Sequence, residues 1–521
     1  MRRIGWIALA AALLCAPAFA ADEPKGEGGG HGDKTPAEKA VEAETATAPV
    51  VEAKSVTHHS VTIDGRAIAY TATAGTLTLR DEDGKPTASM FYVAYVADAA
   101  KGAAPRPVTF FYNGGPGSSS YWLHMGSFGP VRVRTSSPDS TTGAPYDYGP
   151  SNESLLDKTD IVFLDAIGAG FSRPLGAAKG KDFWGVDQDV DAFARGIIRY
   201  ITVNNRWNSP KFLFGESYGT PRSAALVNEL QQRNVQFNGV LLLSSILNYG
   251  IRDDGFDQLY VTYLPSYAAA AWYHNKLVGK PADLPAFLQE VRDWARGPYL
   301  AALQKGSDLP PAEADAIAQK LSAYTGLSVQ FLKEADLRVS LGRFRKELLR
   351  DQRRTIGRYD SRFVGIDIDA AGETPGFDAA GSYNGGPYLG AFQSYLAGEL
   401  DYHTDLTYRP SNDEIGRAWD WKHKPPGAQR PSPEPDTALD LANAMRENPH
   451  LKVFSLNGYY DMATPFFGTE YDISHMQLDP TLRRNVRFAY YPSGHMVYLN
   501  PDALKTMKAD VAKFYDDAVG R

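Results

Sequence analysis

The sequence predicts an α/β fold with a mostly parallel central sheet, antiparallel strands at its N-terminal end and an inserted helical segment. Short apolar runs that alternate with helical stretches indicate the parallel sheet. Alternating apolar runs joined by a turn-forming cluster indicate the antiparallel beginning. The segment 250–430 carries little strand signal and is too long for a loop in a compact domain, so it predicts a helical insertion.

The composition fits a globular protein of ordinary type. The 521 residues are 43% hydrophobic and 22% charged, and this length can bury a large core and carry a second part. The formal charge of −7 supplies no basic surplus to neutralise a phosphate backbone. Nucleic acid is therefore not an expected partner.

The first 20 residues have the pattern of an export signal. Two arginines precede an apolar stretch at 4–14, and a small-x-small cleavage site ends at Ala20. Alternatives are an N-terminal helix, or a lipid on Cys15, where Leu14 stands in place of the small residue required before it. We expect cleavage after Ala20, an exported protein that is periplasmic or secreted, and no stable membrane insertion. Cleavage would remove the single cysteine and change the net charge to −9.

Residues 21–55 predict a disordered tether, because they contain almost no large apolar side chain and cannot offset the entropy of ordering. The main domain is then expected at 56–249 and 431–521, with the helical cap at 250–430 between its two parts. Strands are expected at 61–70, 76–79, 88–96, 108–112, 161–165, 212–214, 240–243, 453–456 and 486–490, and helices at 187–200 and 224–233. The turn cluster 83–86 joins the second and third runs, which predicts a hairpin.

Three features of the cap admit a functional and a plainer interpretation. The basic run 343–354 is expected to be a solvated or salt-bridged helix face rather than a nucleic-acid site. The acidic loop 367–373 lacks the full ligand spacing of a calcium loop, so no metal or other cofactor is expected. The remaining feature is a set of tyrosines that could line a pocket, although their helical spacing favours core packing: Tyr260, Tyr263 and Tyr267.

The strongest chemical signal is a G-x-S-x-G pentapeptide at 215–219. It directly follows the apolar run 211–214 and precedes a helical stretch. This is the setting of a nucleophile elbow, in which glycines permit the sharp turn that exposes the serine. Ser217 is the candidate nucleophile.

A serine hydroxyl needs a base and a group that orients the base. In this architecture, the acid and then the histidine should each follow a late strand. Asp461 follows the run 453–456, and His495 follows the run 486–490. His475 is a rival base, but no strand leads into it, and Asp461 could instead cap a helix.

A third motif, Asn113 to Ser120, follows the run 108–112. A Gly-Gly turn lets backbone N–H groups approach a ligand closely, as an oxyanion hole requires, although a tight turn alone would also explain the glycines.

With these motifs in this order, the sequence resembles the serine carboxypeptidases, and specifically their bacterial exported members. The resemblance extends over about 56–514 and rests on 113–120, 215–219, 457–465 and 494–496, with 163–172 as a fifth similar motif. It implies an α/β-hydrolase fold and removal of C-terminal residues from peptides that have a free C-terminus.

The resemblance also implies roles for individual residues. Ser217, Asp461 and His495 would form the catalytic triad, and the N–H groups of Gly115 and Tyr218 the oxyanion hole. A further two residues would bind the substrate's terminal carboxylate, namely Asn113 and Glu216. A carboxyl group can face a carboxylate only if it holds a proton and donates it, so the family favours acidic conditions.

Two positions depart from the family pattern. Ser118 stands where the family often has a cysteine, and Ser127 stands where it tends to carry a second glutamate. The single glutamate leaves the pH optimum open. An esterase or acyltransferase with the same triad is the alternative function, and a non-catalytic binding protein is a second alternative.

Overall fold

The computed structural model describes residues 48, 50–98, 102–253 and 255–520. The predicted signal peptide, Cys15 and most of the predicted tether lie outside these residues, so the predictions made for them stay predictions.

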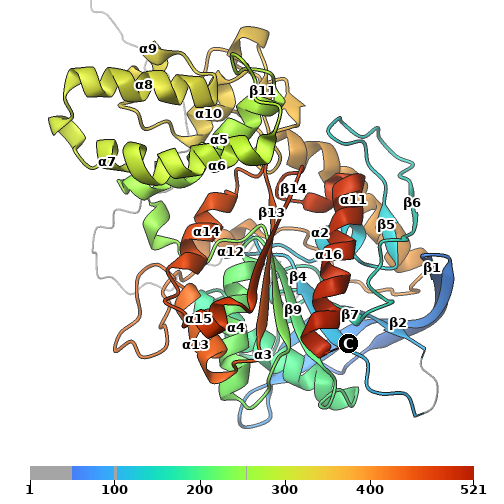
Figure 1. Cartoon of the computed structure of the whole chain (residues 1–521). Coiled ribbons are helices and arrows are strands. Elements are labelled where there is room, and N and C mark those ends of the chain that lie inside the picture. Colours follow the sequence, from blue (N-terminus) through green and yellow to red (C-terminus); the bar gives the residue numbers. More distant parts are fainter. Residues whose placement is uncertain (1–47, 49, 99–101, 254, 521) are drawn as a thin grey trace, which may run out of the picture. The chain divides into compact units, whose positions relative to one another are not determined.

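The described residues form a ten-stranded sheet (Figure 1). It is parallel from β7 to β14 and antiparallel among β1, β2, β3 and β7. Its strands lie in the order β1 (Lys54–Ile63), β2 (Arg66–Arg80), β3 (Pro86–Ala97), β7 (Asp160–Leu164), β4 (Val108–Tyr112), β9 (Lys211–Glu216), β10 (Gly239–Leu243), β13 (Lys452–Gly458) and β14 (Val486–Tyr491), with β8 (Arg173–Pro174) paired to β3. The predicted fold class is confirmed.

The N-terminal strands differ from the prediction in two places. The run 61–70 was expected to be one strand, but Asp64 and Gly65 form a turn within it, with φ of 47° and 77°. An Asp-Gly pair in these conformations makes a tight hairpin between β1 and β2. In addition, β1 begins at Lys54, inside the predicted tether, and Glu52 is ion-paired with Arg199 at 2.7 Å. The described structure therefore includes residues at the end of the segment predicted to be a tether.

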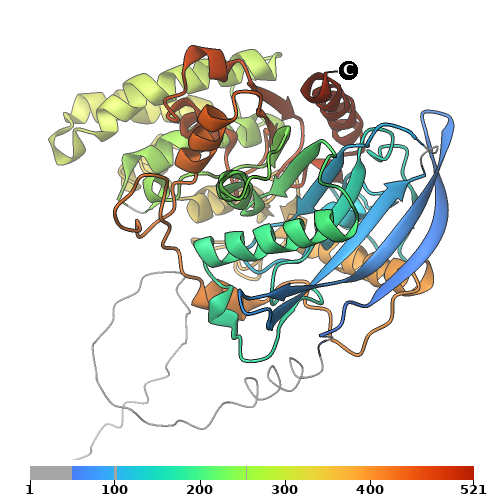
Figure 2. The same cartoon turned by 90° about the horizontal axis from the view of Figure 1, so that it is seen from below.

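Helices cover both faces of the sheet (Figure 2). Helices α3 (Val186–Val203), α4 (Gly219–Gln232) and α13 (Ala438–Glu447) pack on one face, where Phe110 is buried. Helices α2 (Tyr121–Gly126), α11 (Ala379–Gly398) and α16 (Pro501–Val519) pack on the other face, where Phe111 is buried. Consecutive side chains of a strand point to opposite faces, so both faces are apolar, as in other buried parallel sheets.

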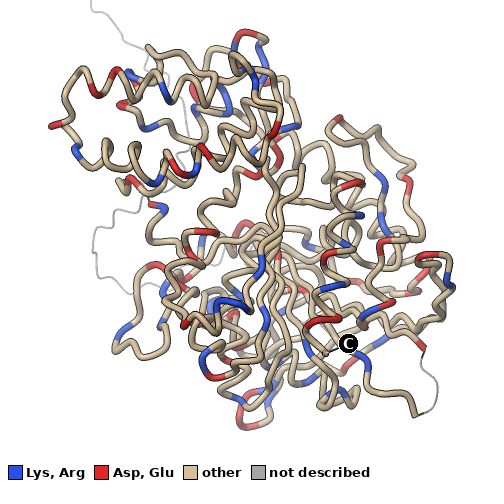
Figure 3. The backbone as a smooth tube through the Cα atoms, in the orientation of Figure 1, with Lys and Arg blue, Asp and Glu red and all other residues tan. Residues whose placement is uncertain are grey.

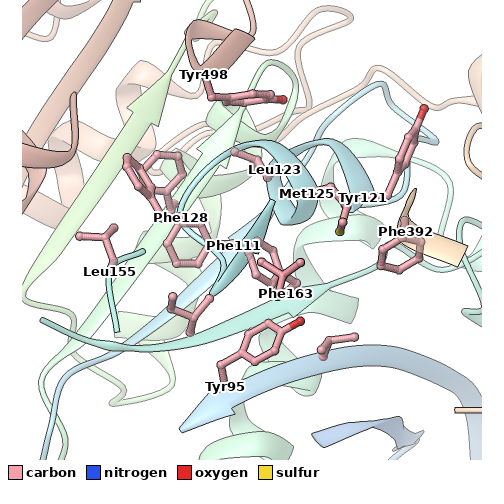
Figure 4. Close-up of a cluster of buried hydrophobic side chains, with 14 of the residues drawn as sticks. Tyr95, Phe111, Tyr121, Leu123, Met125, Phe128, Leu155, Phe163, Phe392 and Tyr498 are labelled. Carbon is pink, nitrogen blue, oxygen red and sulfur yellow. The ribbon is translucent and has the colours of Figure 1, made fainter. Parts of the chain in front are cut away.

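Aromatic side chains fill the second face (Figure 4). The rings of Phe111 and Phe214 stack with centroids 4.7 Å apart, and His124 stacks on Phe163 at 4.2 Å. Figure 4 shows Tyr498 at the upper edge of this cluster. The core therefore reaches up to the loops at the carboxyl ends of the strands.

The segment 250–430 has two different packing environments. Helices α5 (Asp257–Tyr273), α6 (Leu284–Trp294), α7 (Leu300–Leu303), α8 (Pro311–Thr325), α9 (Val329–Glu334) and α10 (Leu341–Glu347) share a hydrophobic cluster that is continuous with α14 (Phe466–Ser474). Tyr267 belongs to this cluster and stacks on Phe344 at 3.9 Å, as core packing predicts. Helix α11 instead packs into the core of the sheet. The exact domain boundaries remain a prediction.

Remaining short elements connect these layers. They are β5 (Val131–Val133), β6 (Tyr148–Pro150), β11 (Thr355–Ile356), β12 (Val364–Gly365), α12 (Asp413–Ala418) and α15 (Pro480–Arg483). No helix among the described residues is both long and apolar enough to span a membrane.

Basic and acidic side chains are interspersed over the chain (Figure 3). Ion pairs account for much of the basic run 343–354, because Arg343 contacts Glu373 at 3.1 Å and Lys346 contacts Asp367 at 2.7 Å. The Lys346 ammonium also donates to the carbonyl of Asp369. The acidic loop 367–373, which was weighed as a calcium loop, thus binds the ammonium group of Lys346.

Candidate active site

The pentapeptide at 215–219 forms a sharp turn between β9 and α4. Ser217 has a φ of 60°, a strained backbone conformation for a residue other than glycine. A Cβ atom on Gly215 would lie only 2.0 Å from the carbonyl oxygen of Gly219, so the turn requires a glycine there. Glu216 and Tyr218 are buried, whereas Ser217 is half-buried. The turn therefore presents the Ser217 side chain and hides those of its neighbours.

Asp461 and His495 are joined by a hydrogen bond. The Nδ1–H of His495 donates to Oδ2 of Asp461 at 2.8 Å, and the carboxylate is fully buried. Oδ1 of Asp461 accepts from the N–H groups of Ala463 at 2.7 Å and Thr464 at 3.0 Å. These donors hold the carboxylate so that it fixes the tautomer of His495 and leaves Nε2 as the base.

Backbone contacts from two other segments hold His495. Its N–H donates to the carbonyl of Tyr359 at 2.6 Å, and its carbonyl accepts from the hydroxyl of Ser244 at 2.6 Å. Asp360 accepts from the N–H of Gly494 at 3.1 Å. The loop at 359–360 lies inside the predicted cap, so this part of the chain helps to place the imidazole.

The pKa of His495 is raised above its usual value. Burial alone would lower it, but Asp461 and Glu216 favour the charged imidazolium, while Arg358 opposes it. The side chain of Arg358 is exposed, and its guanidinium lies over the ring of Tyr359 at 5.3 Å. The Tyr359 ring in turn lies 5.3 Å from that of His495. An exposed cation is therefore close to the base.

The sheet brings Ser217 to the same edge as Asp461 and His495. Its N–H donates to the carbonyl of Leu243 at 3.0 Å, and the following residue, Ser244, bonds to His495. In the described part of the chain no hydrogen bond joins the Ser217 hydroxyl to His495. Such bonds are often long before a substrate binds.

The glycine turn after β4 lies directly against the serine elbow. A Cβ atom on Gly114 would lie 2.3 Å from the backbone nitrogen of Tyr218, so only glycine permits this approach. Gly115 is exposed and has a φ of 107°. Within the described residues the N–H groups of Gly115 and Tyr218 donate to no other group. Both N–H groups can therefore donate to an oxyanion, and their assignment to an oxyanion hole stays a prediction.

Asp165, in the fifth motif, supports this turn from below. Its Oδ1 accepts from the N–H of Ser120 at 2.7 Å, and burial raises the pKa of its carboxyl to about 7, although Ser120 and Arg173 lower it.

Asn113 and Glu216 lie together beneath the elbow. Oδ1 of Asn113 accepts from the N–H of Leu123 at 2.9 Å, which leaves its amide N–H groups to act as donors, and Asn113 is close enough to Glu216 to lower the pKa of that carboxyl. Glu216 is buried, and burial raises its pKa to about 7, against His495, Tyr498 and Asn113, which lower it. The carboxyl can therefore hold a proton near neutral pH.

The two serines that depart from the family pattern, Ser118 and Ser127, both bond to backbone carbonyls. Ser127 is buried, and its hydroxyl donates to the carbonyl of Leu123 at 2.5 Å. Ser118 donates to the carbonyl of Ser119 at 3.1 Å.

Sequence reasoning missed several residues of the site. The hydroxyl of Thr464 lies 2.8 Å from Oδ2 of Asp461, and Tyr498 donates to both oxygens of Glu216 at 3.0 and 3.2 Å. Tyr498 lies only three positions after His495, which was its one signal. The rival base His475 is exposed at the end of α14, where its Nδ1 donates to the carbonyl of Tyr471 at 2.7 Å.

Part of the chain is similar to known serine carboxypeptidases. Residues 67–276 match the serine carboxypeptidase family. Serine carboxypeptidase-like 36 from Arabidopsis thaliana is 26% identical over 177 residues, which are 33% of this chain and 34% of that protein, so the chain spans about a third of this relative. The crystal structure of Kex1Δp, a prohormone-processing carboxypeptidase from Saccharomyces cerevisiae, matches with a TM-score of 0.53 and 15% identity, over 86% of this chain and 92% of that chain. The chain has the α/β-hydrolase fold.

Proposed function

We propose that the protein is a serine carboxypeptidase that releases residues from the C-terminus of peptides through an acyl-enzyme. The observation that carries the proposal is the buried pair Asn113 and Glu216, of which Glu216 directly precedes the half-buried Ser217 in the elbow. A buried carboxyl that keeps a proton near neutral pH can donate to a substrate carboxylate. An esterase acting on neutral substrates has no need of such a group.

In the proposed mechanism, Ser217 Oγ attacks the carbonyl carbon of the last peptide bond while Nε2 of His495 takes its proton. The Asp461 carboxylate stabilises the imidazolium that results. The N–H groups of Gly115 and Tyr218 bind the oxyanion of the tetrahedral intermediate. His495 then gives the proton to the leaving amine, and a water molecule hydrolyses the acyl-enzyme by the same steps in reverse order.

The test compares two forms of one peptide, the free acid and its C-terminal amide. Glu216→Ala should reduce kcat/KM for the free acid far more than for the amide, because only the free acid uses the carboxylate site. Equal losses on both would refute the carboxylate-binding role and favour the esterase or acyltransferase alternative. Glu229→Ala, a change on the outer surface of α4, is the control and should alter neither rate.

The non-catalytic alternative has its own test. A fluorophosphonate probe should label the folded protein, and Ser217→Ala should abolish the labelling. A folded wild-type protein that the probe does not label would refute the enzyme proposal.

We also propose that the protein is exported after cleavage behind Ala20, on the pattern of residues 1–20. Protein recovered from a periplasmic or culture fraction should begin at Ala21 by N-terminal sequencing. Recovery of the uncleaved chain from the cytoplasm alone would contradict this.

A further inference from the structure

We infer that Tyr498 is a positioning residue of the proposed carboxylate site, acting through its buried contact with Glu216. The inference rests on the proposed function. It concerns how the site holds its single carboxyl group and what this does to substrate binding.

The contact between Tyr498 and Glu216 is direct and fully buried. The phenol oxygen lies 3.0 Å from Oε2 and 3.2 Å from Oε1 of Glu216, and neither side chain is more than 2% exposed. A phenol O–H donates to a carboxyl oxygen whether the carboxyl is charged or neutral. When Glu216 is neutral, the phenol can act as the donor in this contact, which leaves the carboxyl proton available to a substrate carboxylate.

The ring of Tyr498 packs closely against α2. A Cβ atom on Gly126 would lie 2.4 Å from Cδ2 and 2.5 Å from Cε2 of Tyr498, so the ring rests on the backbone of α2. Ser127, the next residue, turns its hydroxyl to the carbonyl of Leu123 and does not reach Glu216. Gly126, Ser127 and Tyr498 carry no carboxyl group, so Glu216 is the single carboxyl among these residues.

This arrangement predicts a different pH dependence from that of a carboxyl pair. Two facing carboxyls must share a proton, so both take part in the titration. Burial and the neighbouring Glu216 hold the pKa of Tyr498 well above its usual value, so Tyr498 stays a donor at every working pH. Only Glu216 then titrates within the carboxylate site. The titratable groups that act on Glu216 from the packed elements are Tyr498, Tyr388 of α11, Asp461 and His495.

The first experiment uses the wild-type protein. The KM for a free-acid peptide should be constant at low pH and rise with a slope of one in log KM against pH above the pKa of Glu216. The KM for the amide should not follow this rise. A slope of two for the free acid would reveal a second titrating carboxyl and overturn the inference.

The second experiment replaces Tyr498 by phenylalanine, which keeps the ring on Gly126 and removes only the hydroxyl. We expect KM for the free acid at pH 5–6 to rise about tenfold, the effect of one lost hydrogen bond to a binding group, with kcat nearly unchanged. In the wild type, the hydrogen bond from Tyr498 lowers the pKa of Glu216. Its removal should raise that pKa, so the KM rise should begin at a higher pH. Tyr299→Phe is the matched control, because Tyr299 is also a buried tyrosine but lies in the cluster of α5 to α10, where its hydroxyl donates to the carbonyl of Leu337 at 2.6 Å; this change should alter neither quantity.

The outcomes separate the inference from the proposed function. If the wild-type protein does not hydrolyse free-acid peptides, the proposed function fails and the inference fails with it. If the wild type is active but Tyr498→Phe has an unchanged KM and pH profile, or the same change with the amide, only the inference is overturned. Fluorophosphonate labelling of each variant checks that the elbow is intact.

Discussion

Glu216 gives a sharp prediction about stability, because a buried carboxyl with a raised pKa makes the fold sensitive to pH. Its pKa is about 7 in the folded chain against 4.5 for an unperturbed glutamate. Between these values the native state holds a proton that the unfolded state has lost, so the free energy of unfolding falls as pH rises through this window. Glu216→Gln keeps the shape and the hydrogen-bonding capacity but cannot ionise. The variant should therefore lack this part of the pH dependence.

The magnitude follows from the size of the shift. The difference in pKa corresponds to about 3 kcal/mol of stability that the wild type loses between pH 4.5 and 8. The variant should match the wild type near pH 4, where both side chains are neutral, and exceed it by about 3 kcal/mol at pH 8. In a chain of this length that is about 3 °C in Tm.

Thermal unfolding of both proteins at pH 4 to 8 measures this difference. Glu52→Gln is the control with the opposite sign: burial raises the pKa of Glu52, but the bond to Arg199 outweighs it and lowers the pKa, so this variant should lose stability at neutral pH. A Tm difference between Glu216→Gln and wild type that is constant with pH, or that is largest at pH 4, would refute the reasoning.

Three further predictions concern the base and the walls of the site. Asp461→Asn should reduce kcat by about 10³-fold or more, because the anion that orients His495 and stabilises its charge is lost. The measurement is a stopped assay on a free-acid peptide, and a clearly smaller loss would contradict this role. Arg358→Gln should raise the pKa of His495 and move the acid limb of the kcat/KM profile to higher pH, and a shift to lower pH would contradict the charge argument. Gly126→Ala should destabilise the fold by about 1–3 kcal/mol, because the new methyl group collides with the Tyr498 ring, and an unchanged denaturation midpoint would be inconsistent with this contact.

Local patterns predicted the sheet well. The six parallel strands fall where short apolar runs stand, because a strand buried on both faces needs mostly apolar side chains, although the edge strand β14 also carries the exposed Arg487. The turn at Asp64 and Gly65 was missed although the Asp-Gly signal is local, since the apolar alternation on both sides continues through it. Alternation alone does not separate one long strand from a hairpin.

In the candidate site too, residues with a local sequence signal were predicted and residues that depend on distant contacts were missed. Ser217 and the Gly114–Gly115 turn were identified because their glycines are required by local backbone geometry. Tyr498 and Tyr359 were missed, because their roles depend on contacts across the fold, such as the 2.6 Å bond from the His495 N–H to the Tyr359 carbonyl. Packing of α11 on the sheet was also not foreseen, since an apolar helix does not reveal which partner it covers.

The close backbone approach of Gly114 to Tyr218 has a consequence for how substrate preference can change. Because no side chain fits between the two turns, the oxyanion donors and the serine elbow form one rigid unit that tolerates no adjustment by mutation. Variation must instead occur in the walls around this unit. The exposed side chain of Arg358 lies outside both turns and can be substituted without moving the N–H groups, so relatives with different substrates are expected to diverge at such positions first.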